Sequence, residues 1–142
     1  MDCTFCKIIE GEINSHIIYK DDLITCFLDI EPINEGHVLI IPNKHYLDID
    51  EIPNETLISI MSFTKKIVKV LKERYSPDGY SIMQNGGVFN DIGHYHLHVF
   101  PRYREEGFGW NFSNAEQVVS EDIAKDFKKL LIKQNENRYK LW

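Results

Sequence analysis

Three histidines stand at alternate positions in the run His94-Tyr95-His96-Leu97-His98. The chain holds 6 histidines in 142 residues, and at that density three alternate histidines arise by chance in about one sequence in a hundred. Side chains at alternate positions of a β-strand point to one face, so an extended run places three imidazoles on one face and apolar side chains on the other. A single histidine at such a position would be typical of a polar, solvent-exposed face of the strand. Three aligned histidines favour a metal site or a nucleophilic site.

Composition limits the class of protein around this run. A chain of 142 residues with 43% hydrophobic and 27% charged residues has the length and composition of one globular domain. Its net charge of −6 argues against binding to nucleic acid or to a membrane surface, so an anionic partner should be small. The first residues show no signal-peptide pattern, and the longest apolar run, Val38–Ile41, is far shorter than a membrane span. We expect a cytoplasmic protein.

Turn residues and hydrophobic periodicity predict an α+β fold, with an antiparallel sheet of about five strands, one long helix and a C-terminal helix. The expected strands are Ile17–Tyr19, Leu23–Leu28, His37–Ile41, Tyr80–Gln84 and His94–Phe100, and the expected helices are Asn54–Arg74 and Ser120–Lys133. Asn54 and Ser120 fit the N-cap positions of these helices.

The run His94–Phe100 resembles the His-x-His-x-His-x-x signature of the histidine triad (HIT) family, in which x is usually hydrophobic. Phe5–Ile13 is similar to the opening segment of that family, and Phe27–Pro32 followed by Gly36–His45 is similar to its second block. The resemblance spans residues 3–104. It implies a HIT domain over residues 1–110, with residues 111–142 as a C-terminal helical extension packed on the same domain. It also implies a homodimer.

The resemblance implies a nucleotide-binding hydrolase or transferase that needs no catalytic metal. His96 would attack the α-phosphorus of a nucleoside phosphoramidate or dinucleoside polyphosphate, and water would hydrolyse the nucleotidyl-histidine. His98 would hydrogen-bond the phosphate and the leaving group. This role suits imidazole, which has a free lone pair near neutral pH, provided that its other nitrogen donates to an acceptor.

The same resemblance assigns residues that bind substrate. Asp29 matches the carboxylate that accepts the two ribose hydroxyls, and Asn85 and Asn90 match residues on the phosphate side. Apolar positions match the pocket for the base: Phe5, Ile8, Ile13, Phe27 and Ile30. Asp91 stands where many relatives have a phosphate-binding Ser or Thr, and its carboxylate would repel phosphate. The preferred substrate therefore stays open.

Cys3 and Cys6 form a Cys-x-x-Cys pair that is a weak signal alone. Several bacterial relatives hold zinc with an arrangement similar to Cys3, Cys6, His45 and His94. Two thiolates and two imidazoles would close a tetrahedral structural zinc site. The alternative is a pair of free cysteines, with the two histidines bonding near the substrate.

A rival interpretation of the whole chain is a zinc-binding interaction module that catalyses no reaction. The last residues fall outside the resemblance. There, Trp110 or Trp142 would help to set specificity for the leaving group. The remaining His16, His37 and Cys26 suggest no function.

Overall fold

The structure, a computed structural model, describes residues 2–140, and their side chains as far as residue 135. The chain divides into two units, residues 1–108 and residues 109–142. No helix in the described part of the chain is long and apolar enough to cross a membrane.

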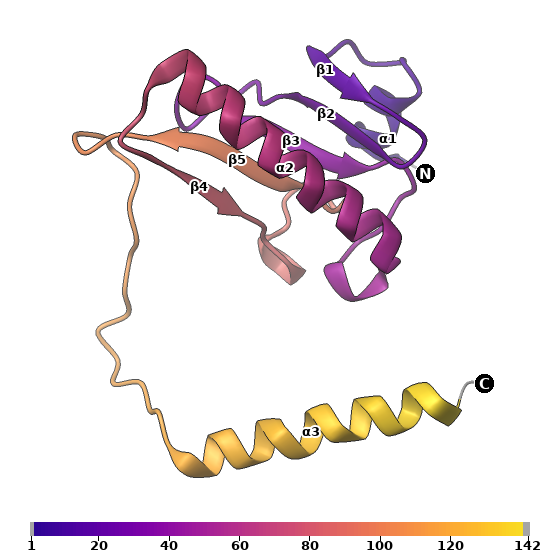
Figure 1. Cartoon of the computed structure of the whole chain (residues 1–142), viewed down its shortest axis with the longest axis vertical. Coiled ribbons are helices and arrows are strands. Elements are labelled where there is room, and N and C mark those ends of the chain that lie inside the picture. The colour runs from indigo at the N-terminus through magenta and orange to yellow at the C-terminus, as the bar shows by residue number, and fades with distance from the viewer. Residues whose placement is uncertain (1, 141–142) are drawn as a thin grey trace. The chain divides into compact units, whose positions relative to one another are not determined.

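The first unit is built on a sheet of five antiparallel strands (Figure 1). In chain order the strands are β1 (Ile17–Lys20), β2 (Ile24–Leu28), β3 (Val38–Pro42), β4 (Gly79–Met83) and β5 (Leu97–Arg102). Their order across the sheet is β1-β2-β3-β5-β4, so β5 lies between β3 and β4. The predicted α+β fold with a five-stranded antiparallel sheet is confirmed.

The histidine run begins before its strand. Strand β5 starts at Leu97, so His98 is the only triad histidine within it, and the prediction of a strand from His94 is wrong at that end. Pairing of β5 with β3 stops at Leu97, opposite Ile40. Two residues further along, β3 reaches Pro42, which has no backbone N–H and whose carbonyl oxygen accepts a hydrogen bond from the His94 ring.

Alternation of the two faces nevertheless extends through the run. Tyr95, Leu97 and Val99 are buried on one side of the sheet, in the hydrophobic core beneath the long helix. The histidines point to the other side, where the ring of Phe5 meets the rings of both His94 and His96. Packed side chains therefore cover both faces of this segment.

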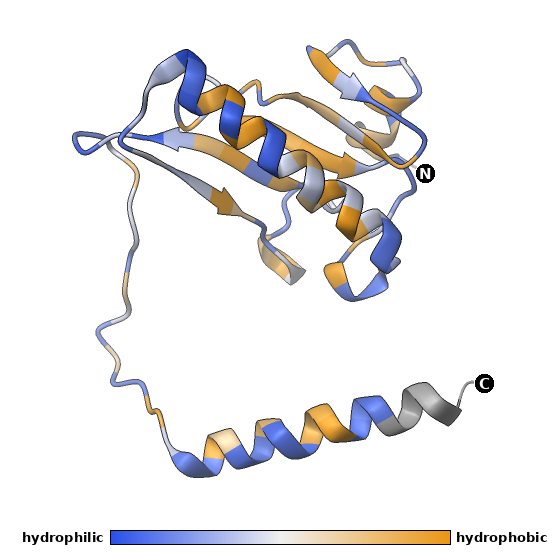
Figure 2. Cartoon of the chain, in the orientation of Figure 1, coloured by the Kyte–Doolittle hydropathy of each residue, from blue (hydrophilic) through white to orange (hydrophobic). Residues whose placement is uncertain are grey.

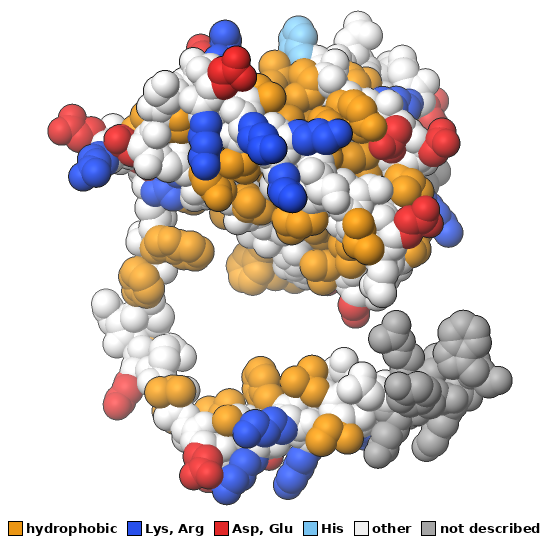
Figure 3. Space-filling view, viewed as in Figure 1, with side chains coloured by type: hydrophobic (Ala, Val, Ile, Leu, Met, Phe, Trp, Pro, Cys, Tyr) orange, Lys and Arg blue, Asp and Glu red, His pale blue; other side chains and the backbone are white. Residues whose placement is uncertain are grey.

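The long helix α2 (Asn54–Tyr75) crosses the first face of the sheet (Figure 1). It buries Ile60, Ile67 and Leu71 in the core and exposes four lysines on its outer side (Figure 3): Lys65, Lys66, Lys69 and Lys72. The predicted N-cap is displaced by one residue, since Pro53 holds that position without a side-chain hydrogen bond and Asn54 is already helical. Ser76 ends the helix in the left-handed conformation.

A short helix, α1 (Thr4–Ile9), covers the opposite face and was not predicted. Its Phe5 and Ile8 pack against Phe27, Leu39 and Ile41 of the sheet. Six residues are too few for a hydrophobic period to be recognised. Cys3 caps α1, because its Sγ accepts a hydrogen bond from the Cys6 backbone N–H at 3.4 Å.

Two short 3-10 helices, η1 (Ile49–Glu51) and η2 (Gly87–Phe89), lie in the loops that follow β3 and β4. The second unit contains helix α3 (Glu121–Lys140), which extends beyond the predicted end at Lys133. Ser120 caps α3 as predicted, since its Oγ accepts a hydrogen bond from Ile123 N–H at 3.3 Å.

Helix α3 carries apolar side chains that are partly exposed within the second unit (Figure 2): Ile123, Phe127, Leu130 and Leu131. Packing of this extension on the first domain stays a prediction. Trp110 is exposed, and Trp142 lies outside the described residues.

Candidate active site and metal centre

His96 is held in one tautomer by its own backbone neighbourhood. Its Nδ1–H donates a 2.8 Å hydrogen bond to the carbonyl oxygen of His94, the acceptor that nucleophilic attack requires. The other ring nitrogen, Nε2, therefore carries the lone pair. The His96 side chain is only 3% exposed, and the edge of the Phe5 ring lies against its ring at 5.2 Å between centroids.

His98 is oriented by His37, a residue to which the sequence suggested no function. The backbone N–H of Ile33 donates to His37 Nδ1 at 3.0 Å, so His37 carries its proton on Nε2. That Nε2–H donates to His98 Nδ1 at 2.9 Å. His98 must then carry its own proton on Nε2, as a hydrogen-bond donor.

Burial keeps these two histidines neutral. It lowers the pKa of His98 to about 4, and the neighbouring His96 and His37 lower it further. Burial also lowers the pKa of His37, although Asp29, with Oδ2 3.5 Å from His37 Nε2, opposes the shift. While His37 and His98 are both neutral, each ring accepts at Nδ1 and donates from Nε2, so the hydrogen bonds run in one direction from Ile33 through His37 to His98.

A pocket of about 460 Å³ adjoins these rings. His96 and His98 form part of its wall, with Asp29 nearby. The apolar residues predicted for the base all line it: Phe5, Ile8, Ile13, Phe27 and Ile30. The arrangement thus offers an apolar wall, a carboxylate and two neutral imidazoles, which match the base, the ribose and the phosphate of a nucleotide.

The two asparagines predicted on the phosphate side do not line this pocket. Asn90 Oδ1 accepts hydrogen bonds from the backbone N–H groups of Ile92 and Gly93, and its Nδ2 donates to the carbonyl oxygen of Leu47. Asn90 therefore shapes the loop that leads into the triad. Asn85 follows β4, also outside the lining, whereas Asp91 is part of it.

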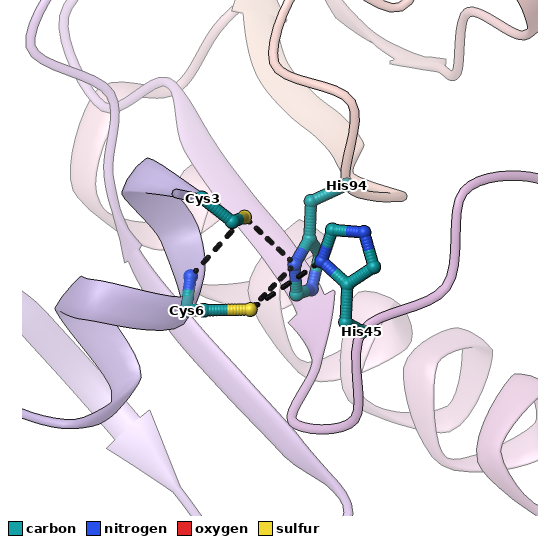
Figure 4. A group of neighbouring side chains, drawn as sticks. All are labelled: Cys3, Cys6, His45 and His94. Carbon is teal, nitrogen blue, oxygen red and sulfur yellow. Dashed lines mark hydrogen bonds between the residues drawn. The ribbon is translucent and has the colours of Figure 1, made fainter. Parts of the chain in front are cut away.

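Cys3, Cys6, His45 and His94 come together from three parts of the chain (Figure 4). One ligand atom from each lies within 4.8 Å of the others. Nδ1 of His94 is 3.4 Å from Cys3 Sγ and 3.6 Å from Cys6 Sγ, and Nδ1 of His45 is 3.4 Å from Cys6 Sγ. The cysteines belong to the start of α1, His45 to the loop after β3, and His94 to the segment before β5.

The chemistry of these four side chains fits a zinc ion. His94 Nε2–H donates to the carbonyl oxygen of Pro42 at 2.9 Å, which leaves the Nδ1 lone pair facing the sulfur atoms. Burial, reinforced by Cys3, raises the pKa of Cys6 to about 11, and burial lowers the pKa of His94 to about 4. A divalent cation would favour the thiolates and would use the free lone pair of His94.

Comparison with known proteins places this geometry in context. A family model described as HIT domain matches residues 10–105. Adenosine 5'-monophosphoramidase of Candida albicans is 42% identical over 137 residues, which cover 90% of this chain and 88% of that protein.

Solved structures agree with the fold. The crystal structure of a HIT family protein from Bacillus anthracis has a TM-score of 0.84 and 32% identity, covering 94% of this chain and 96% of that one. A zinc-bound histidine triad family protein from Mycobacterium smegmatis has a TM-score of 0.71 and 32% identity, covering 81% of this chain and 85% of that one.

Proposed function

The chain belongs to the histidine triad family as a member of its hydrolase class, and we propose that it cleaves nucleotides at the α-phosphorus with His96 as nucleophile. Its substrates are nucleoside phosphoramidates or dinucleoside polyphosphates. The observation that carries this proposal is the His96 tautomer, because donation from Nδ1–H to His94 leaves Nε2 free to attack. His96 also lines the pocket.

In the first step His96 Nε2 forms a bond to phosphorus, and the bond from phosphorus to the leaving nitrogen or oxygen breaks. The leaving group takes a proton from water, while His98 Nε2–H holds it by a hydrogen bond. In the second step water attacks phosphorus, the P–Nε2 bond breaks, and the water proton returns to solvent. The two steps together add one water molecule across the original bond, with no metal in either.

The pocket supports a nucleoside at this position. The Phe5 and Phe27 rings meet edge to face at 5.3 Å and provide apolar surface for a base. The Asp29 carboxylate can accept hydrogen bonds from both ribose hydroxyls. One of its oxygens already accepts from Glu31 N–H at 2.9 Å, which fixes the carboxylate's direction.

We propose that Cys3, Cys6, His45 and His94 hold a structural zinc ion. The relative from Mycobacterium smegmatis with bound zinc supports this proposal. Four protein ligands leave no open position for water, so the ion would stabilise the fold rather than activate a nucleophile.

The structure shows no disulfide among the described cysteines Cys3, Cys6 and Cys26, which fits the proposed cytoplasmic location. We also propose a homodimer. Strand β4 is at an edge of the sheet and exposes Tyr80 and Ile82, while α2 exposes Ile58 and Met61. Light scattering of the purified protein gives the mass that tests this assembly.

The decisive experiment is turnover of adenosine 5'-phosphoramidate in EDTA. The parent protein should release AMP, and His96→Ala should reduce the rate by at least about a thousandfold. His16→Ala is the matched control, because His16 is exposed and outside the pocket. Turnover that survives His96→Ala would contradict the nucleophile assignment. A zinc-binding interaction module would give no turnover with any of these proteins.

A further inference from the structure

The charges around the pocket are all of one sign. Its lining includes the carboxylates of Asp29, Glu31 and Asp91, and no Lys or Arg among the described residues contributes to it. The imidazoles of His37 and His98 add no positive charge, since burial lowers the pKa of both. A phosphate that enters this pocket therefore meets hydrogen-bond donors without a neutralising cation from these residues.

The nearest of these carboxylates to the reacting atom is that of Asp91. Its Oδ1 lies 3.8 Å from His96 Nε2, the nitrogen that would attack phosphorus. The backbone around Asp91 is held on both sides, because Asn90 Oδ1 accepts from Ile92 N–H at 3.3 Å and from Gly93 N–H at 3.0 Å. The loop thus places Asp91 in the pocket wall, with its side chain 84% exposed to solvent.

The arginines Arg102 and Arg104 are engaged elsewhere. Arg102 pairs with Glu106 and also donates to Ser81 Oγ at 2.8 Å. Arg102 and Arg104 line a separate cavity of about 310 Å³ that shares no residue with the pocket beside His96. These arginines therefore do not offset the charge of Asp91 at His96.

We propose that Asp91 is a specificity-determining residue, which selects nucleotides whose leaving group is uncharged or cationic and disfavours those whose leaving group is a polyphosphate. This inference rests on the proposed function. Every substrate brings the charge of the α-phosphate itself, so that charge does not discriminate between them. A polyphosphate leaving group adds further negative charges next to the α-phosphate at His96, whose Nε2 is 3.8 Å from Asp91, whereas a leaving amine adds none.

Solvent exposure of Asp91 limits the size of the effect. Charges near a protein surface interact through a high effective dielectric constant, so removing one of them changes relative rates by about three- to tenfold. The discrimination should also weaken as salt is added.

The test compares kcat/KM for two substrates: diadenosine tetraphosphate and an adenosine phosphoramidate with a neutral alkylamine leaving group. Asp91→Asn keeps the shape of the side chain and removes its charge. We expect this variant to raise the ratio of tetraphosphate to phosphoramidate kcat/KM about three- to tenfold at low salt, and less at high salt. Asp22→Asn is the control, since it makes the same charge change at an exposed position outside the pocket.

The outcomes separate the two proposals. A ratio that stays at the parent value in Asp91→Asn, while turnover still depends on His96, overturns the role of Asp91 and leaves the proposed function intact. An equal loss of turnover for both substrates also overturns selection by charge. Absence of turnover in the parent, or turnover independent of His96, overturns the proposed function itself.

Discussion

His96 Nδ1–H donates a 2.8 Å hydrogen bond to the carbonyl oxygen of His94, so one triad residue sets the tautomer of the next. The ring of His94 faces the thiols of Cys3 and Cys6, while its backbone faces the candidate nucleophile. The candidate metal centre and the candidate active site therefore share a residue, and each uses a different part of it.

The hydrogen bond from His37 to His98 predicts a positioning role for His37. His37→Phe removes the donor to His98 Nδ1, so His98 Nε2 is no longer fixed as a donor to the leaving group. We expect kcat to fall about 10- to 100-fold, with a smaller change in KM, because a lost orienting partner acts mainly on the reacting geometry. Steady-state kinetics measures the split.

Product affinity is the companion measurement for His37→Phe. A merely structural effect would weaken AMP binding as much as it lowers kcat, and calorimetric titration with AMP would reveal that outcome.

Removal of both thiols should remove the metal. In Cys3→Ser combined with Cys6→Ser, we expect the zinc content by mass spectrometry to drop to background. We also expect Tm to fall by more than about 5 °C, because a tightly bound ion stabilises only the folded state. Cys26→Ala is the control, since Cys26 is buried in the main core away from the four ligands and should keep the metal. Zinc retained by the double variant would make the ligand assignment wrong.

Stability should decrease as the pH falls from about 6.5 towards 4. The pKa of His98 is about 4 in the folded protein, against an ordinary value of 6.5. Between these values the unfolded chain binds more protons than the folded one, so acid favours unfolding, while above 6.5 the contribution of His98 is constant. Urea unfolding should show a loss of about 1–2 kcal/mol from His98 by pH 5.

The variant His98→Gln tests how much of the pH dependence of stability comes from His98. It lacks the titrating group, so its stability should change less with pH over the same window. An unchanged slope would contradict the assignment, because the pH dependence would then come from groups other than His98.

Asp29 should distinguish ribonucleotides from 2'-deoxyribonucleotides. Loss of the carboxylate in Asp29→Asn removes an acceptor for the ribose hydroxyls, so we expect preference for the ribose substrate to shrink about tenfold. The ratio of kcat/KM for the two phosphoramidates measures it. Glu31 is a nearby carboxylate on the pocket wall, and Glu31→Gln should leave this ratio unchanged. If Glu31→Gln lowered the ratio as much as Asp29→Asn does, Asp29 would have no special role in ribose recognition.

The sheet and α2 could be predicted because their signals are local. Alternation and turn residues locate β1 to β5 within a few residues. The three-residue step from Leu57 to Ile60 and the four-residue step from Ile67 to Leu71 identify α2. The core face of the triad segment also follows from alternation alone. Helix α1 escaped prediction because it is too short to repeat a period, and it forms where Phe5 and Ile8 pack on the sheet.

Other features of the site could not be predicted, because they depend on the register of strands that are distant in the sequence and on which hydrogen-bond partners a side chain meets in the folded protein. His37 reaches His98 because β3 pairs with β5 with Leu39 opposite His98, which puts His37 and His98 on one face. Pairing these two strands in that register would have revealed the contact. Asn90 has the chemistry to bind phosphate, yet its Oδ1 accepts from Ile92 and Gly93 and one of its two amide N–H donors bonds to Leu47.

Cys3 links the pocket beside His96 to the sulfur atom that caps α1. The thiol caps α1, and a helix of 6 residues has too few internal hydrogen bonds to persist without such support. The same helix carries Phe5 and Ile8 on the wall of the pocket. Loss of this cap would therefore loosen the α1 side of the pocket first, while the five strands of the sheet remain paired.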